Sequence, residues 1–198
     1  DDSKSFAQVR ELEDQVDTFQ MQITSYLTDL SQETLSEEVS TELPVLLHAV
    51  NDLERVGDHA VNIVEIAERK RAQKLEFTGA ATQEADQIKD ELILMFQRVV
   101  AALEGSDTGA AGSALGNERN LNQMQLEFRR SHVARMTDGI CTAVTGLIFI
   151  DLVDSAEKIG DHLTNIAQAT IGGLQWEGVK PRVRNSSESD ESEPVAQR

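Results

Sequence analysis

Two segments of the sequence carry the same spaced pair of carboxylic acids. Glu54 and Asp58 lie four residues apart in VNDLERVGDHAVNI, and Glu157 and Asp161 hold the same spacing in VDSAEKIGDHLTNI. Residues four apart lie on one face of a helix. Carboxylates that converge inside a helix bundle repel one another, and a multivalent cation relieves that repulsion. The spacing makes these four acids candidate metal ligands.

The two segments are copies of an internal repeat. The second begins 103 residues after the first, and Val, Glu, Gly, Asp, His, Asn and Ile match at the same positions. A further pair, Glu13 and Asp17, precedes the first copy and aligns with Glu118 and Asn122 before the second. Each repeat unit is therefore predicted to contain a pair of helices that carries inward-facing acids.

Helical wheels place the acids among apolar residues. At about 100° per residue, Glu54 lies within the apolar stripe of its helix and Asp58 lies about 40° to one side. Glu157 and Asp161 repeat this placement. A charge on a buried face is costly unless it is paired or bound to a metal.

Cationic partners for these acids are predicted to be few. The same wheels direct four side chains away from the acids, toward the polar side: Arg55, His59, Lys158 and His162. All-oxygen ligand sets suit hard or borderline ions such as iron, manganese, magnesium or calcium. The alternative is that the acids line the rim of a bundle and form salt bridges with neighbours, since a single Glu-x-x-x-Asp is common in acidic helices.

Other conspicuous residues are expected to have structural roles. His132 is predicted to be a core histidine with its hydrogen bonds satisfied, and Cys141 a buried, inert thiol. Asn62 and Asn165 are expected to form hydrogen bonds between helices. The sequence has no glycine-rich phosphate loop and no Glu-x-x-His di-iron pattern, so it does not indicate an enzyme.

Apolar residues at three- and four-residue steps predict an all-α chain of five helices. The expected helices cover residues 3–30, a segment from a Thr34–Glu37 capping box to about residue 74, and residues 79–104, 107–138 and 142–169. Pro44 is expected to bend the second helix or mark its start. The second repeat unit has a leading helix at 79–104, and the repeat predicts an equivalent helix upstream of Asp1. The sequence therefore divides into residues 1–75, residues 76–173 and a disordered acidic tail at 174–198.

The charge composition argues against some classes of binding partner. The 198 residues include 35 Asp and Glu against 18 Lys and Arg, which gives a net charge of −17 and disfavours nucleic acid and anionic membranes. No run of 18 apolar residues exists, so no membrane span is expected. The single cysteine is compatible with a reducing compartment.

The repeated motif resembles the signature of a known family. The segments NDLERVGDHAVNI, from Asn51, and AEKIGDHLTNI, from Ala156, are similar to the PhoU family signature, and the resemblance covers nearly all of residues 5–170. The segment RRSHVARMTDGICTAVTGLIFIDL, from Arg129, most resembles PhoU-like domains at the cytoplasmic C terminus of bacterial sodium/phosphate cotransporters.

The resemblance implies two three-helix bundles side by side, the first without its leading helix. It also implies multinuclear metal clusters, of iron or zinc, held by Glu(Asp)-x-x-x-Asp pairs. Carried over, the first site would be Glu13, Asp17, Glu54 and Asp58, and the second would be Glu118, Asn122, Glu157 and Asp161. Asn122 departs from the pattern because an amide brings no charge, so the second site is expected to bind more weakly.

The resemblance further implies control of phosphate uptake rather than catalysis. The main hypothesis is a cytoplasmic, metal-binding regulatory domain of a sodium-dependent phosphate transporter, in contact with its membrane domain or subunits at the inner membrane. The alternative is a freestanding PhoU-type regulator that links a phosphate transporter to a sensor kinase. A metal-dependent hydrolase or oxidase and a coiled-coil adaptor are weaker alternatives. Without the leading helix of the first unit, an apolar surface of that unit would be exposed, and this exposure would favour self-association.

Overall fold

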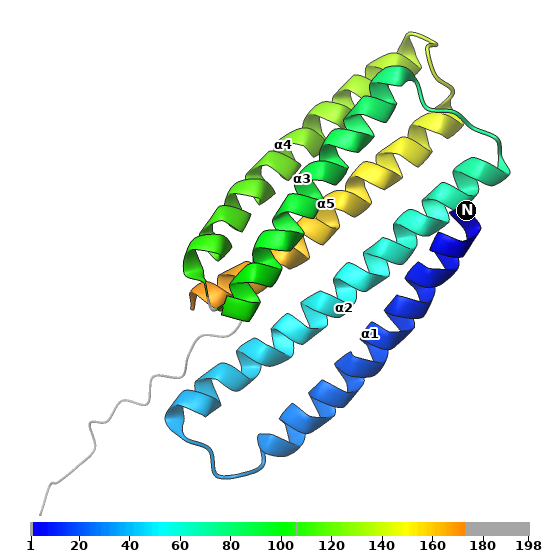
Figure 1. Cartoon of the computed structure of the whole chain (residues 1–198). Coiled ribbons are helices and arrows are strands. Elements are labelled where there is room, and N and C mark those ends of the chain that lie inside the picture. Colours follow the sequence, from blue (N-terminus) through cyan, green and yellow to red (C-terminus); the bar gives the residue numbers. More distant parts are fainter. Residues whose placement is uncertain (1, 106, 173–198) are drawn as a thin grey trace, which may run out of the picture.

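The computed structural model describes residues 2–105 and 107–172, and these form five α-helices (Figure 1). The helices are α1 (Asp2–Leu30), α2 (Glu37–Ala72), α3 (Gly79–Gly105), α4 (Thr108–Thr137) and α5 (Ala143–Ile171). The all-helical prediction is confirmed, and the predicted helix ends agree to within about two residues. The tail predicted to be disordered, 174–198, lies outside the described residues.

Two long helices form the middle of the molecule. α2 and α5 lie side by side, α1 packs on the outer side of α2, and α3 and α4 pack on α5 and on each other (Figure 1). Among the described elements, α1 contacts α2 alone. The division of the chain at residues 75 and 76 stays a prediction.

The start of α2 differs from the prediction. Its N-cap is Ser36, whose backbone is extended and whose hydroxyl accepts a hydrogen bond from the Val39 amide. The predicted Thr34–Glu37 capping box is therefore wrong, because Glu37 is already the first helical residue. Pro44 lies inside α2 and does not mark its start.

The most tightly packed core belongs to α3, α4 and α5. The largest fully buried side chains all come from these helices: Phe149, Ile88, Met95, Leu121, Leu163, Ile166, His132, Val99 and Val153. Leu27 is the one buried apolar residue of α1 among its described side chains. None of the described helices combines the length and hydropathy that a membrane span requires.

Mid-helix glycines let neighbouring helices approach closely in both units. A Cβ atom at Gly160 would lie 2.9 Å from Leu121 Cδ1, and one at Gly57 would lie 3.6 Å from Glu13 Cγ and 3.7 Å from Val16 Cγ1. Val16 and Leu121 occupy equivalent positions in the repeat, as Gly57 and Gly160 do. The two units therefore pack α1 on α2 and α4 on α5 at the same places.

Candidate metal centre

Three predicted ligands meet where α1 crosses α2. One carboxylate oxygen from each of Glu13, Asp17 and Asp58 lies within 4.8 Å of the others, and all three side chains are half-buried. Glu13 and Asp17 share a face of α1 because they are four residues apart. Gly57 faces Glu13 and brings α1 close to Asp58. Three carboxylates at this spacing offer the oxygen ligands that hard or borderline cations prefer.

The carboxylates of this cluster repel one another. Burial raises the pKa of Glu13, and repulsion from Asp17, Asp14 and Asp58 raises that pKa further. Asp17 Oδ1 is also buried without a hydrogen-bond partner among the described residues. An orphaned oxygen beside repelling carboxylates is what a cation site requires, so the residues present fit a bound cation.

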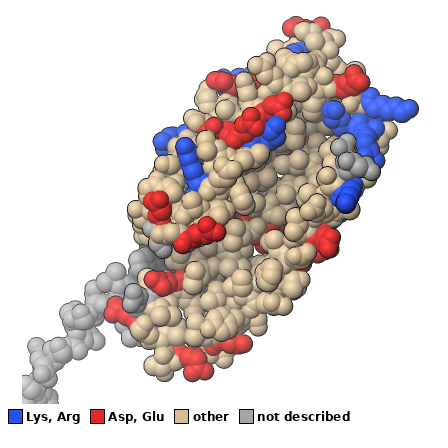
Figure 2. Space-filling view, in the orientation of Figure 1, with Lys and Arg blue, Asp and Glu red and all other residues tan. Residues whose placement is uncertain are grey.

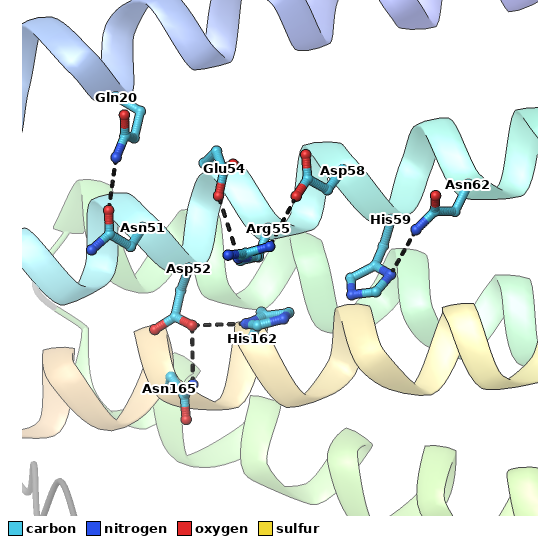
Figure 3. A network of polar contacts seen from close by, with 10 residues as sticks. All are labelled: Gln20, Asn51, Asp52, Glu54, Arg55, Asp58, His59, Asn62, His162 and Asn165. Carbon is cyan, nitrogen blue, oxygen red and sulfur yellow. Dashed lines mark hydrogen bonds and ion pairs between the residues drawn. The ribbon is translucent and has the colours of Figure 1, made fainter. Parts of the chain in front are cut away.

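Glu54, the fourth predicted ligand, lies beside this cluster and is paired with an arginine. Arg55 Nε is 3.6 Å from Glu54 Oε2, and Arg55 Nη1 is 3.3 Å from Asp58 Oδ2 (Figure 3). Burial is the largest cause of the raised pKa of Glu54, followed by repulsion from Asp58, while Arg55 opposes both. Arg55 therefore neutralises part of the charge of Glu54 and Asp58, for which no cationic partner was predicted. The prediction that Arg55 points away from these acids is wrong.

Each of the three carboxylates at the second predicted site has a hydrogen-bond or salt-bridge partner. Asn122 Nδ2 donates a 2.6 Å hydrogen bond to Glu118 Oε1, and Lys158 Nζ lies 3.2 Å from Glu157 Oε2 and 2.8 Å from Asp161 Oδ2. These contacts, with that to Asp161 first, raise the pKa of Lys158. Lys158 was predicted to point away from the acids, and this is also wrong. Among the described residues, Glu13, Asp17 and Asp58 form the one group of three possible metal ligands.

The two motif histidines lie between α2 and α5 rather than on an outer face. The rings of His59 and His162 stack with centroids 5.6 Å apart, and His162 Nδ1 is 2.8 Å from Asp52 Oδ1 (Figure 3). Both histidines point away from the acids, as predicted, but the side of each helix on which they lie is a contact between helices. The physical reason is that α2 packs on α5 with the side opposite Glu54 and Asp58, which point toward α1 (Figure 3).

Asp52 links α2 to α5 at this contact between the two helices. The sequence alone did not identify Asp52 as a functional or structural residue. Asp52 is 7% exposed and accepts hydrogen bonds from His162 and, at 3.0 Å, from Asn165 Nδ2 (Figure 3). The predicted inter-helix role of Asn165 agrees with this geometry. Asn62 instead contacts His59 Nδ1 on its own helix and is exposed. Asp52 corresponds to Ser155 in the second copy, so the repeat gave no signal for it.

His132 is a satisfied core residue, as predicted. Its ring stacks on Phe149 with centroids 4.3 Å apart, and Arg135 Nη2 donates to its Nδ1 at 2.9 Å. Cys141 Sγ lies 3.5 Å from His132 Nε2. Cys141 is partly exposed rather than buried, because it precedes the first turn of α5.

Comparison with known proteins gives consistent matches. The sequence model of the PhoU domain matches residues 1–67 and 86–170. A phosphate-specific transport system accessory protein PhoU homolog from Burkholderia sp is 30% identical over 125 residues, which is 62% of this chain and 52% of that protein. The PhoU homolog 1 from Thermotoga maritima is 26% identical over 126 residues, 64% of this chain and 53% of that protein. The chain thus spans about half the length of these curated relatives. The crystal structure of PhoU from Pseudomonas aeruginosa superposes with a TM-score of 0.78 at 23% identity, covering 84% of this chain and 79% of that one.

Proposed function

Because the chain belongs to the PhoU domain family, we propose that it is a PhoU-type regulator of phosphate transport. The observation that carries this proposal is the family match across both repeat units. The relatives are named as accessory proteins of phosphate-specific transport systems. Their names favour a regulator that acts with a separate transporter over a domain fused to one. The family is one of accessory proteins, in agreement with the prediction that the chain is not an enzyme.

The proposed metal centre consists of Glu13, Asp17 and Asp58, with Glu54 beside them. A bound cation would neutralise these carboxylates and tie α1 to α2. The orphaned Asp17 oxygen and the raised pKa of Glu13 support this assignment. The resemblance favours iron or zinc. The second site, at Glu118, Glu157 and Asp161, is proposed to bind more weakly, because Asn122 brings no charge and Lys158 offsets part of the charge of the acids.

The proposed partners are the membrane subunits of a phosphate transporter, at the cytoplasmic face of the membrane. Cells that lack the gene, cells that carry it and cells with the Asp58→Asn variant would be compared for uptake of radiolabelled phosphate. We expect phosphate uptake to be no longer regulated in cells that lack the gene. Equal phosphate uptake in all three strains, at both high and low external phosphate, would contradict the proposal.

The metal centre has a separate test. Elemental analysis of the purified chain would compare wild type with two matched variants, Asp58→Asn and Asp161→Asn. Both remove the aspartate of a repeat motif and both replace a side chain held by a neighbouring cation. We expect bound metal in wild type and Asp161→Asn, and loss of most of it in Asp58→Asn. Equal metal content in the two variants would contradict the assignment.

One observation favours the cotransporter-fused alternative. The segment from Arg129 through the start of α5 most resembles PhoU-like domains of sodium/phosphate cotransporters. The two hypotheses differ in the gene. An open reading frame that encodes transporter helices joined to this chain would favour fusion, and a separate reading frame would favour the accessory regulator.

A further inference from the structure

Arg55 pairs with both predicted metal ligands of α2. Its Nε lies 3.6 Å from Glu54 Oε2, and its Nη1 lies 3.3 Å from Asp58 Oδ2 (Figure 3). Within residues 2–105 and 107–172, no other lysine or arginine forms an ion pair with either acid. Figure 2 shows that Lys and Arg are otherwise gathered mainly toward one end of the molecule. A cation that binds Glu54 or Asp58 therefore meets a positive charge that is already paired with both.

Glu54 stands apart from the other three acids of the proposed metal centre. Glu13, Asp17 and Asp58 bring one carboxylate oxygen each within 4.8 Å of one another, and Glu54 is not part of this group. Burial raises the pKa of Glu54 most, and repulsion from Asp58 and Asp17 contributes to the same rise. Glu54 therefore lies close enough to the group of three to be affected by its charge. Its ion-pair partner is nevertheless Arg55.

The contacts of Arg55 are weak ones. The Arg55 side chain is 60% exposed, and those of Glu54 and Asp58 are 24% and 34% exposed. An ion pair with so exposed a partner is screened by water and contributes little to stability. A divalent cation carries twice the charge of a guanidinium, and it would also meet the carboxylates of α1. Such a cation should therefore win the competition for the carboxylates that Arg55 holds.

The second copy of the repeat has a basic residue at the same position. Lys158 corresponds to Arg55, and its Nζ lies 3.2 Å from Glu157 Oε2 and 2.8 Å from Asp161 Oδ2. In both units, a basic side chain thus pairs with the two acids of its own helix. The pairing is a property of the repeat unit and not of one side chain alone.

We propose that Arg55 is a displaceable counter-ion of the metal centre. It pairs with Glu54 and Asp58 until a divalent cation takes both carboxylates, and Glu54 then joins the group of three as the fourth ligand. The guanidinium is released to solvent. Arg55 therefore lowers the affinity of the centre, because each binding event must break its two ion pairs. This inference rests on the metal centre proposed above.

Isothermal titration calorimetry with Zn²⁺ tests this role in wild type, Arg55→Gln and the matched control Arg69→Gln. Arg69 also lies on α2, is 51% exposed and forms an ion pair with Asp151, about 21 Å along the helix from Arg55. Since charges that far apart are screened by salt, Arg69→Gln should leave the dissociation constant unchanged. Arg55→Gln should lower the dissociation constant for Zn²⁺ by about tenfold, because the competing positive charge is absent.

Two results would overturn the role of Arg55 alone. One is an Arg55→Gln variant that binds Zn²⁺ no more tightly than Arg69→Gln does. The other is an Arg55→Gln variant that binds Zn²⁺ more weakly than wild type, which would show that Arg55 orients the ligands rather than competes for them. Absence of Zn²⁺ binding in all three proteins would instead overturn the metal centre, and this inference with it. The two failures are therefore distinguishable.

Nuclear magnetic resonance of the arginine Nε–H groups follows the displacement directly. The Arg55 signal is assigned by its absence in Arg55→Gln. Addition of Zn²⁺ to wild type should shift this signal and speed the exchange of its proton with water, because the ion pair with Glu54 is lost. The Arg69 signal should not change. An Arg55 signal that stays the same while Zn²⁺ binds would show that both ion pairs survive, and would overturn the displacement.

Discussion

The two copies of the Glu-x-x-x-Asp motif differ in how their charge is balanced. In α5 a lysine lies within 3.2 Å of both acids, and in α2 an arginine lies at 3.3 Å and 3.6 Å from them. The α2 acids also face Glu13 and Asp17 from α1, whereas the α5 acids face a position occupied by Asn122. Counted as formal charges, the four acids with Arg55 leave more negative charge in the first unit than Glu118, Glu157 and Asp161 with Lys158 leave in the second.

The buried Asp52 provides a test at the scale of one side chain. Asp52→Ala removes the acceptor for His162 and Asn165, and leaves both donors between α2 and α5 without that partner. We expect the free energy of unfolding to fall by about 1–3 kcal/mol. Urea denaturation measures this change. Asp90→Ala is the control, since the Asp90 side chain is 74% exposed, and equal effects of the two variants would contradict the proposed role.

Two histidines make stability depend on pH. Burial, and then the neighbouring His162, lowers the pKa of His59, while burial and then Arg135 lowers that of His132. Below their usual pKa of 6.5, the unfolded chain takes up protons that the folded chain resists. The contribution of these two histidines to the free energy of unfolding should therefore decrease as pH falls below 6.5. Chemical denaturation at a series of pH values should show this decrease, and His59→Gln should make it shallower. An identical slope in the variant would exclude His59 as a contributor.

At the scale of helices, the apolar spacing predicted where each element begins and ends but not which faces meet. The wheel correctly grouped Glu13 with Asp17 and placed Asp58 near the inward face of α2. It could not predict that Arg55 and Lys158 reach back to the acids of their own helices, because long side chains bridge wide angles. It also could not predict the contact of Asp52 with His162, because that contact depends on α2 packing against α5.

The mid-helix glycines test helix packing in a matched pair. Gly57→Ala should be neutral or stabilise the protein by up to about 1 kcal/mol, because its Cβ fits at ordinary contact distance and alanine favours helix. Gly160→Ala places a Cβ 2.9 Å from the buried Leu121 and should be less stable than Gly57→Ala by about 1–3 kcal/mol. Thermal unfolding of both variants gives the comparison. A Gly160→Ala variant as stable as Gly57→Ala would show that Leu121 moves freely.

At the scale of the whole molecule, packing is uneven. Helices α3, α4 and α5 share the fully buried core, whereas α1 is held by α2 alone among the described helices. Its polar attachments to α2 include the pairing of Arg10 with Glu68 and a hydrogen bond from Gln20 to Asn51 (Figure 3). Local opening should therefore begin at α1.

Hydrogen exchange measures this difference. In metal-free protein at low concentration, the backbone amides of α1 should exchange faster than those of α5. Addition of Zn²⁺ should slow exchange in α1, because a cation held by Glu13, Asp17 and Asp58 would join α1 to α2. The Asp58→Asn variant serves as control and should not respond. Uniform protection across the five helices, with or without Zn²⁺, would contradict this account.

The stacked rings of His59 and His162 also bear on the history of the chain. They occupy the same position in the two copies of the repeat, and residues at equivalent positions touch each other only near a two-fold axis. The contact between α2 and α5 thus has the geometry of a dimer of single units, which duplication and fusion of one gene segment would produce. A substitution in the subunit of a homodimer appears in both subunits, whereas a substitution in one of two fused copies leaves the other copy unchanged. In a single chain the two copies are free to differ, and here Asp52 contacts His162 while its counterpart is Ser155, and Asp17 has Asn122 as its counterpart.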